Sequence, residues 1–202
     1  MKSFGNTIQP EIHSFAERIL TEQDFKEIDA YIDRLDGNKE KRRKAVEDLQ
    51  NVFDFGPKRP LYYLRMALRG LPEQTRDIMR YSGDYIDQLL KYVSYDMGNQ
   101  GILKLKTNGL KLSLGTNLRK LRQELPLDLY TNLEGFNNVL YVPAKHQFEV
   151  KGRPHLFSAR EAITSLYIMK RLAPQISILS ENAKLYSENK MADYFYDKSQ
   201  RY

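Results

Sequence analysis

The sequence predicts an all-α protein, an up-and-down helical bundle with an N-terminal helical extension. Three observations lead to this fold class. Apolar residues recur at spacings of three and four through most of the chain, residues that cap helix starts precede several of these stretches, and Gly or Pro follows them. Hydrophobic residues make up 41% of the 202 residues and charged residues 29%, a composition that supports a folded core.

The N-terminal part of the chain predicts three short amphipathic helices. Residues 10–20 form the first, and the second runs from a cap at Thr21 to a stop at Gly37. Asn38 can cap the third. The Gly- and Pro-rich segment 54–60 then breaks the helical period and predicts a loop.

Longer amphipathic segments predict the bundle itself, at 72–95, 114–141 and 158–179. The last opens with the clearest start signal in the chain, a capping box formed by Ser158 and Glu161. Residues 102–112 alternate apolar and basic side chains around an Asn-Gly pair, which predicts either a small β-hairpin or an extended loop. Residues 142–157 read as a loop.

This pattern divides the chain into three parts. We expect an N-terminal helical subdomain at 1–56, a helical bundle at 71–180 and a C-terminal tail at 181–202. The tail holds Tyr186, Tyr194, Phe195 and Tyr196 among polar residues. It is therefore either a loosely docked short helix or partly disordered.

Several function classes are disfavoured by composition. The chain has no cysteine, which excludes disulfides, thiolate nucleophiles and cysteine zinc sites and agrees with a cytoplasmic protein. With only three histidines, and without the Gly-rich phosphate loops or the HExxH and GxSxG motifs, we expect no metal centre and no cofactor. No run of eighteen apolar residues and no secretory leader is found, so we expect no membrane partner.

Positive charge is concentrated in one stretch of the chain. The formal net charge is +6, and residues 101–171 hold 12 Lys and Arg residues against 5 Asp and Glu residues. Such a surplus suits a polyanion such as RNA or DNA, because cations that contact phosphates release bound counterions. The residues expected to contact nucleic acid are Lys104, Lys106, Lys111, Arg119, Lys120, Arg122, Lys145, Arg153 and His155.

A second basic cluster and a high tyrosine content can each be interpreted in more than one way. A second basic cluster, Lys39, Lys41, Arg42, Arg43 and Lys44, is interpreted as the solvated face of its helix. The chain has fourteen tyrosines and no tryptophan. Tyrosines can stack on unpaired bases, although at helical positions they are also common at the edge of a core.

One group of side chains could support chemistry. Lys145 and His146 are followed by Arg153 and His155 in the predicted loop. Imidazole titrates near neutral pH, so His146 could shuttle protons while a neighbouring cation holds a phosphodiester. The alternative is that His146 braces the end of a helix and His155 lies at the surface.

Residues 76–178 resemble the HEPN (higher eukaryotes and prokaryotes nucleotide-binding) helical bundles. The resemblance rests on RYSGDYIDQLLKYV (80–93), FNNVLYVPAKHQF (136–148) and HLFSAREAITSLYIMKRL (155–172). It implies a dimer, and in active members a metal-independent ribonuclease of toxin–antitoxin, abortive-infection or CRISPR-linked systems. The family's active motif places an arginine four to six residues before a histidine. Neither His146 nor His155 has that arginine, so the resemblance favours a non-catalytic or divergent member.

Three functions therefore stay open. The first is a non-enzymatic helical module that binds nucleic acid, or a partner associated with it, through a basic face in a defence or toxin–antitoxin setting. The second is a divergent ribonuclease that uses His146, with Lys145 or Arg153 as the phosphate clamp. The third is a protein-interaction subunit, with a homodimer or another protein as partner, in which the charge only favours solubility.

Overall fold

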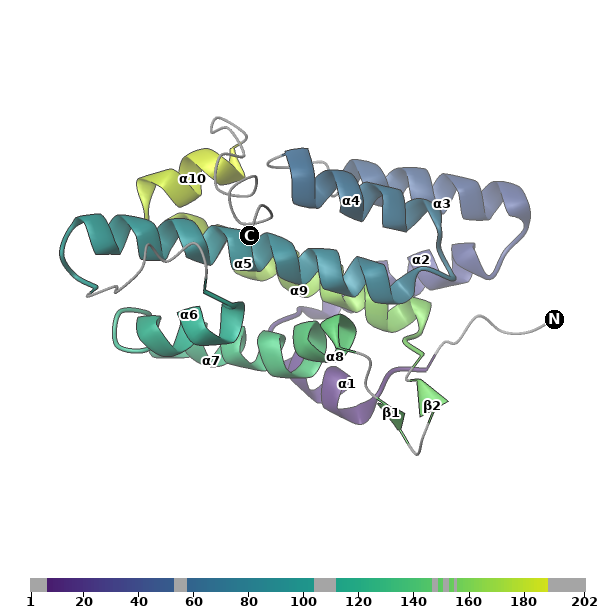
Figure 1. Cartoon of the computed structure of the whole chain (residues 1–202). Helices are drawn as coiled ribbons and strands as arrows, with labels where there is room; N and C mark the ends of the chain where they lie inside the picture. Colours follow the sequence, from purple (N-terminus) through teal and green to yellow (C-terminus); the bar gives the residue numbers. More distant parts are fainter. Residues whose placement is uncertain are drawn as a thin grey trace.

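The helices α5 and α9 form the centre of an all-α, up-and-down helical bundle (Figure 1). The structure, a computed structural model, describes residues 7–52, 58–103, 112–146, 149–150, 153–154 and 156–188. The first five helices are α1 (Pro10–Glu17), α2 (Glu22–Leu35), α3 (Lys39–Val52), α4 (Lys58–Arg69) and α5 (Thr75–Asn99). They are followed by α6 (Leu114–Leu121), α7 (Leu127–Gly135), the π-helix η2 (Phe136–Tyr141), α8 (Val142–Lys145), the strands β1 (Glu149–Val150) and β2 (Arg153–Pro154), α9 (Ala159–Ser177) and α10 (Glu181–Ser187).

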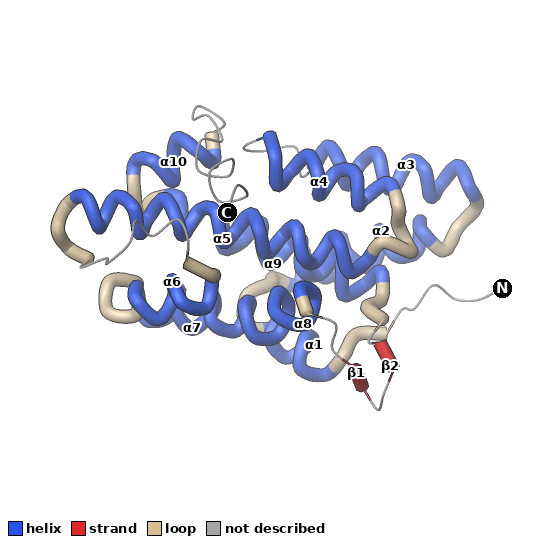
Figure 2. The backbone as a smooth tube through the Cα atoms, viewed as in Figure 1, coloured by secondary structure: helices blue, strands red, loops and turns tan. Residues whose placement is uncertain are grey.

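The remaining helices lie on different sides of this centre, and α4, α6, η2, α8 and α10 pack directly on α5. In Figure 1, α3 and α4 lie along one side of α5, whereas α6, α7, η2, α8 and α1 lie along the other. Figure 2 shows the same arrangement as a backbone tube, with the two short strands beside α1. This layout separates the surface of α3 and α4 from that of α6.

A single hydrophobic core joins these elements. α5 is buried on nearly every side between Ser82 and Val93, as expected for a helix at the centre of a bundle. Its close contact with α9 uses small residues, and the Oγ atoms of Ser82 and Ser165 are 3.3 Å apart. The core contains residues of α1, α2, α3, α4 and α10 as well as those of the bundle. The predicted three-part division stays a prediction.

The predicted helix starts are confirmed where a cap marks them. The Oγ of Ser158 accepts from the backbone N–H of Glu161, whose carboxylate accepts from the backbone of Ser158, which is the predicted capping box. Thr21 forms a second capping box with Asp24. The Oδ1 of Asn38 accepts from the N–H of Lys41 at 2.9 Å.

Several predicted boundaries are wrong. The long helix ends at Asn99 rather than at 95, and the last three residues of the predicted loop 54–60 belong to α4. The long helix begins at Thr75 rather than at Pro72, because the N–H groups of Glu73 and Gln74 both bond to the carbonyl of Gly70 and fold residues 71–74 into a turn. Residues 142–157 are not all loop. They include α8, where Pro143 is tolerated in the first helical turn, and the antiparallel pair β1–β2.

The segment 127–145 is continuous but not uniform. α7 passes directly into η2, in which hydrogen bonds span five residues instead of four. Gly135 stands at this junction, and a Cβ there would overlap the ring of Phe15. A glycine is therefore needed for α1 to pack so close to the start of η2.

The two remaining predictions concern segments that are only partly described. The predicted hairpin or loop at 102–112 falls mostly on residues 104–111, which lie outside the described residues. In the tail, α10 is a docked helix with Ala183 and Tyr186 buried. The side chain and backbone N–H of Asn182 both bond to the carboxylate of Asp96 on α5.

Candidate functional site

The predicted basic stretch is only partly described. Lys104, Lys106, Lys111 and His155 lie outside the described residues. For Arg153 the backbone is placed, in β2, and its side chain is outside the description. Their predicted contacts with nucleic acid stay predictions.

Three predicted cations lie together on α6. Arg119, Lys120 and Arg122 are exposed near the C-terminal end of this short helix. A guanidinium nitrogen of Arg119 donates to the hydroxyl of Thr116 at 3.3 Å. The guanidinium of Arg122 lies 5.9 Å from the ring centre of Tyr130. These side chains are available to solvent at this end of the bundle.

Two other cations of the stretch are paired with acids of α2. Arg160 forms an ion pair with Asp29 at 2.5 Å, and Arg171 donates two hydrogen bonds to the carboxylate of Asp24, at 2.9 and 3.0 Å. Burial opposes ionisation of Asp24, but the hydrogen bonds from Arg171 and Thr21 outweigh it and lower the pKa of its carboxyl. These pairs fix α2 on α9, so part of the charge surplus has a structural role.

Lys145 belongs to a polar cluster between η2, α8 and α5. The hydroxyl of Tyr141 donates to a carboxylate oxygen of Asp84 at 2.7 Å, and the ammonium of Lys145 donates to that hydroxyl at 3.0 Å. Burial raises the pKa of Asp84, although the hydrogen bond from Tyr141 and the charge of Lys145 oppose the shift. Gly83 makes this contact possible, because a Cβ there would overlap the ring of Tyr141.

A second ion pair extends the cluster along α5. Lys91 and Asp87 are four residues apart, with Nζ and Oδ2 at 2.8 Å, and their side chains are only 11% and 12% exposed. Burial raises the pKa of Asp87, and Lys91 opposes the shift. Two carboxylates and two lysines thus balance one another where α5 meets η2 and α8. The cluster is best explained as an internal brace for this junction.

His146 follows this cluster in the sequence. Its side chain is exposed, and its backbone N–H donates to the carbonyl of Val142 at 2.9 Å, which closes α8. The neighbouring Lys145 is directed to Tyr141. The predicted grouping of both residues with Arg153 and His155 stays a prediction, since the latter two side chains are outside the description.

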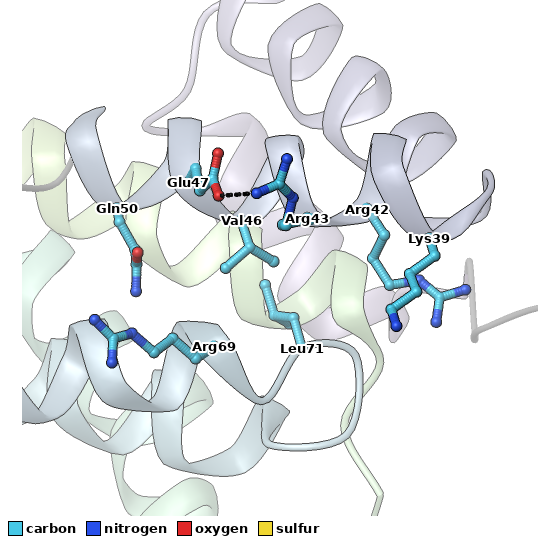
Figure 3. Close-up of a pocket in the computed structure, with 8 residues that line it drawn as sticks. All are labelled: Lys39, Arg42, Arg43, Val46, Glu47, Gln50, Arg69 and Leu71. Carbon is cyan, nitrogen blue, oxygen red and sulfur yellow. Dashed lines mark ion pairs between the residues drawn. The ribbon is translucent and has the colours of Figure 1, made fainter.

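Among the described residues, a strongly basic cavity lies elsewhere, between α3 and the end of α4 (Figure 3). Its volume is about 600 Å³, within the range of about 300–1,000 Å³ that is usual for ligand sites. We call it the α3–α4 pocket. It is lined by Lys39, Arg42, Arg43, Val46, Glu47, Gln50, Arg69 and Leu71, that is, four cations, one carboxylate, one amide and two apolar residues.

Local contacts hold the wall of the pocket in place. The Nε of Arg42 donates to the carbonyl of Leu35 at 3.0 Å, which anchors this side chain to the end of α2. The amide of Gln50 donates to the carbonyl of Arg65 at 2.8 Å and ties α3 to α4. Leu71, which is buried, and Val46 form an apolar floor in the middle of the pocket (Figure 3).

The carboxylate of the pocket is weakly held. Glu47 pairs with Arg43 at 3.5 Å, and their side chains are 52% and 73% exposed. Exposed pairs of this kind contribute about 0–1 kcal/mol, so an anionic ligand can displace Glu47 from Arg43 at little cost. With Lys39 and Arg69 also exposed, the pocket presents a surplus of cations around an apolar floor. Chemically, the arrangement suits phosphate or another anionic group.

The sequence contains part of the signal for this pocket. Lys39, Arg42, Arg43 and Val46 follow the spacing i, i+3, i+4, i+7 and therefore share one face of α3. Interpreting the cluster as a solvated face is compatible with the exposure of Lys39 and Arg43. This interpretation did not predict that Arg69 of α4 forms the opposite wall of the pocket. Arg69 comes from a different helix, and no local sequence pattern indicates that it lies near α3.

A second cavity, of about 330 Å³, lies between α6 and the α7–η2 segment. The side-chain Nδ2 of Asn137 donates to the side-chain Oδ1 of Asn138 at 2.8 Å. Both residues line the cavity together with Arg119 and Glu134. One cation and one carboxylate face this space, so its charge is balanced. The cavity is smaller and less basic than the α3–α4 pocket.

Within the described parts of the chain, no three His, Cys, Asp or Glu side chains come together as metal ligands would. Among the described helices, none combines the length and apolar character needed to cross a bilayer. Comparison with protein-family models, curated proteins and solved structures finds no match to this chain. The resemblance to HEPN bundles therefore stays a prediction.

Proposed function

We propose that this protein is a helical module that binds nucleic acid through the α3–α4 pocket. The observation that supports the proposal is the convergence of four cations from α3 and α4 on one cavity of about 600 Å³. Only one carboxylate, Glu47, lines the same cavity. Backbone phosphates supply the complementary charge.

The chemistry of the side chains favours a phosphate group over a small monatomic anion. Arg42, Arg43 and Arg69 carry planar guanidinium groups, which can donate two parallel hydrogen bonds to a phosphate. Lys39 adds a compact charge at the end of the pocket. Each phosphate that these groups neutralise releases counterions, so binding should weaken steeply as salt concentration rises.

The basic surface of α6 offers a matched control. Arg119, Lys120 and Arg122 are exposed and lie on the opposite side of α5 from the α3–α4 pocket (Figure 1). A triple alanine variant of α6 removes as much charge as a triple alanine variant of Lys39, Arg43 and Arg69. Arg42 is kept because it anchors the end of α2.

The test is fluorescence anisotropy with a labelled oligonucleotide over a series of salt concentrations. We expect the pocket variant to lose affinity. The slope of the logarithm of the association constant against the logarithm of the salt concentration should become shallower by about 2 for a single strand and by about 3 for a duplex. The α6 variant should keep the wild-type slope. Three results would overturn the proposal: no binding by the wild type at low salt, equal losses in both variants, or a loss in the α6 variant alone.

A further inference from the structure

Beside the α3–α4 pocket, α4 exposes large apolar side chains. Tyr62, Tyr63 and Met66 are 57%, 40% and 43% exposed. Buried residues of α4, Leu64 and Leu68 among them, face the core instead. We call the three exposed residues the aromatic row. A cluster of exposed large apolar side chains is typical of a surface that binds a partner.

The aromatic row leads into the pocket. Tyr62, Met66 and Arg69 follow the spacing i, i+4, i+7 and therefore share the outer face of α4. Arg69 also lines the α3–α4 pocket. The distance along the helix axis from Tyr62 to Arg69 is about 10 Å, since an α-helix rises about 1.5 Å per residue. An aromatic ring, a thioether and a cation are thus arranged along one line of the surface.

The rings of this surface are held by their neighbours. The ring of Tyr63 stacks on that of Tyr81 of α5, with centres 5.5 Å apart and planes inclined by 19°. Tyr62 meets Tyr63 edge to face at 5.6 Å. The guanidinium of Arg80 lies 4.5 Å from the ring centre of Tyr81 and donates to its hydroxyl at 2.6 Å. A supported ring loses little freedom when a ligand stacks on it.

We infer that the nucleic acid is single-stranded, with unpaired bases stacked on the aromatic row and phosphates in the α3–α4 pocket. This inference rests on the proposed function. Aromatic side chains beside a basic groove are the elements with which proteins hold single strands, because every base has a face on which to stack. In a duplex the bases are paired and stacked, so a duplex can use only the pocket.

A protein partner is the other occupant that an aromatic row could take. The charge beside the row favours the single strand, because Arg69 follows Met66 on the same helix face and the pocket that it lines holds three more cations and one carboxylate. An apolar protein surface would leave these cations without anionic partners. The two occupants give different results in the experiment that follows.

The experiment compares Tyr62→Ala, Tyr62→Phe and Leu127→Ala in binding to a labelled oligothymidylate and to a duplex of equal length. Leu127 is 77% exposed on α7 and controls for loss of an exposed apolar group. We expect Tyr62→Ala to weaken single-strand binding by about 5- to 100-fold, the usual effect of losing one stacking contact. Its duplex affinity and its salt slope should be unchanged, and Tyr62→Phe and Leu127→Ala should bind like the wild type.

The outcomes separate this inference from the proposed function. If the wild type binds both probes in a salt-dependent manner and Tyr62→Ala changes neither, the single-strand inference is wrong and the proposed function stands. The aromatic row would then have no part in binding nucleic acid. If the wild type binds neither probe at low salt, both proposals fail. Thermal melting of each variant, which should match the wild type because Tyr62 is exposed, shows that the fold is intact.

Discussion

Replacing Gly83 by alanine should destabilise the protein, although alanine is the better helix former. Gly83 lies inside α5, where a change from Gly to Ala ordinarily gains about 1 kcal/mol. Here the new Cβ would lie 2.5 Å from Cγ of Tyr141 and closer still to Cδ2. The ring of Tyr141 must therefore move away from α5, and its hydroxyl must leave the carboxylate of Asp84.

The expected loss follows from these contacts. Overpacking in a buried site costs about 1–3 kcal/mol, and a hydrogen bond to a charged group contributes about 1.5–3 kcal/mol. After the gain in helix propensity, Gly83→Ala should lower the free energy of unfolding by about 1.5–5 kcal/mol. For a chain of this size, a loss of that magnitude lowers Tm by about 3–20 °C.

Urea denaturation followed by circular dichroism measures this change. Gly115→Ala is the matched control, because a Cβ at Gly115 would meet its nearest neighbour, an Asn137 side-chain atom, at an ordinary 3.4 Å. That variant should be neutral or slightly more stable. In a Tyr141→Ala background, Gly83→Ala should also stop being destabilising. A stabilising effect of Gly83→Ala in the wild-type background would refute the proposed packing of Tyr141 on α5.

Two further predictions concern the contacts of α9. Arg171→Ala should lower the free energy of unfolding by about 1–2 kcal/mol at pH 7, because it leaves the buried Asp24 without its cation. The pKa of Asp24 is lowered in the folded state, so this contribution is present above its ordinary value of 3.8 and is lost as the pH falls through the folded-state pKa. Urea denaturation at pH 7 and pH 3 tests this prediction, and an equal loss at both pH values would contradict it. Ser158→Ala should cost about 1 kcal/mol and Ser158→Gly only a few tenths, as measured by the urea midpoint. A loss below a few tenths of a kcal/mol in Ser158→Ala as well would contradict the prediction and show that the cap of Ser158 on α9 adds little.

Local patterns in the sequence were sufficient to predict most helices. The capping box of Ser158 and the cap of Asn38 act within four residues, so the sequence contains all of their partners. The π-helix η2 has no comparable signal. Phe136 and Leu140 are both buried at a spacing that also suits an α-helix, so the wider turn is not visible in the apolar pattern.

The candidate site was harder to predict because its parts come from distant positions. The cations of α3 share a helix face that the spacing reveals, yet Arg69 joins them from another helix. The reverse holds for Arg171, which counts toward the charge surplus in the sequence but pairs with Asp24, 147 positions away. A net charge therefore indicates a class of partner, while the pairing of each cation decides which surface remains to bind it.

The most direct test of the central claim is to map the binding surface by NMR, with ¹⁵N-labelled protein titrated with a short oligothymidylate at low salt. The amide shifts should change along α3 and from Tyr62 of α4 to Leu71. Changes confined to α6, or the absence of any salt-dependent change, would show that the α3–α4 pocket is not where nucleic acid binds.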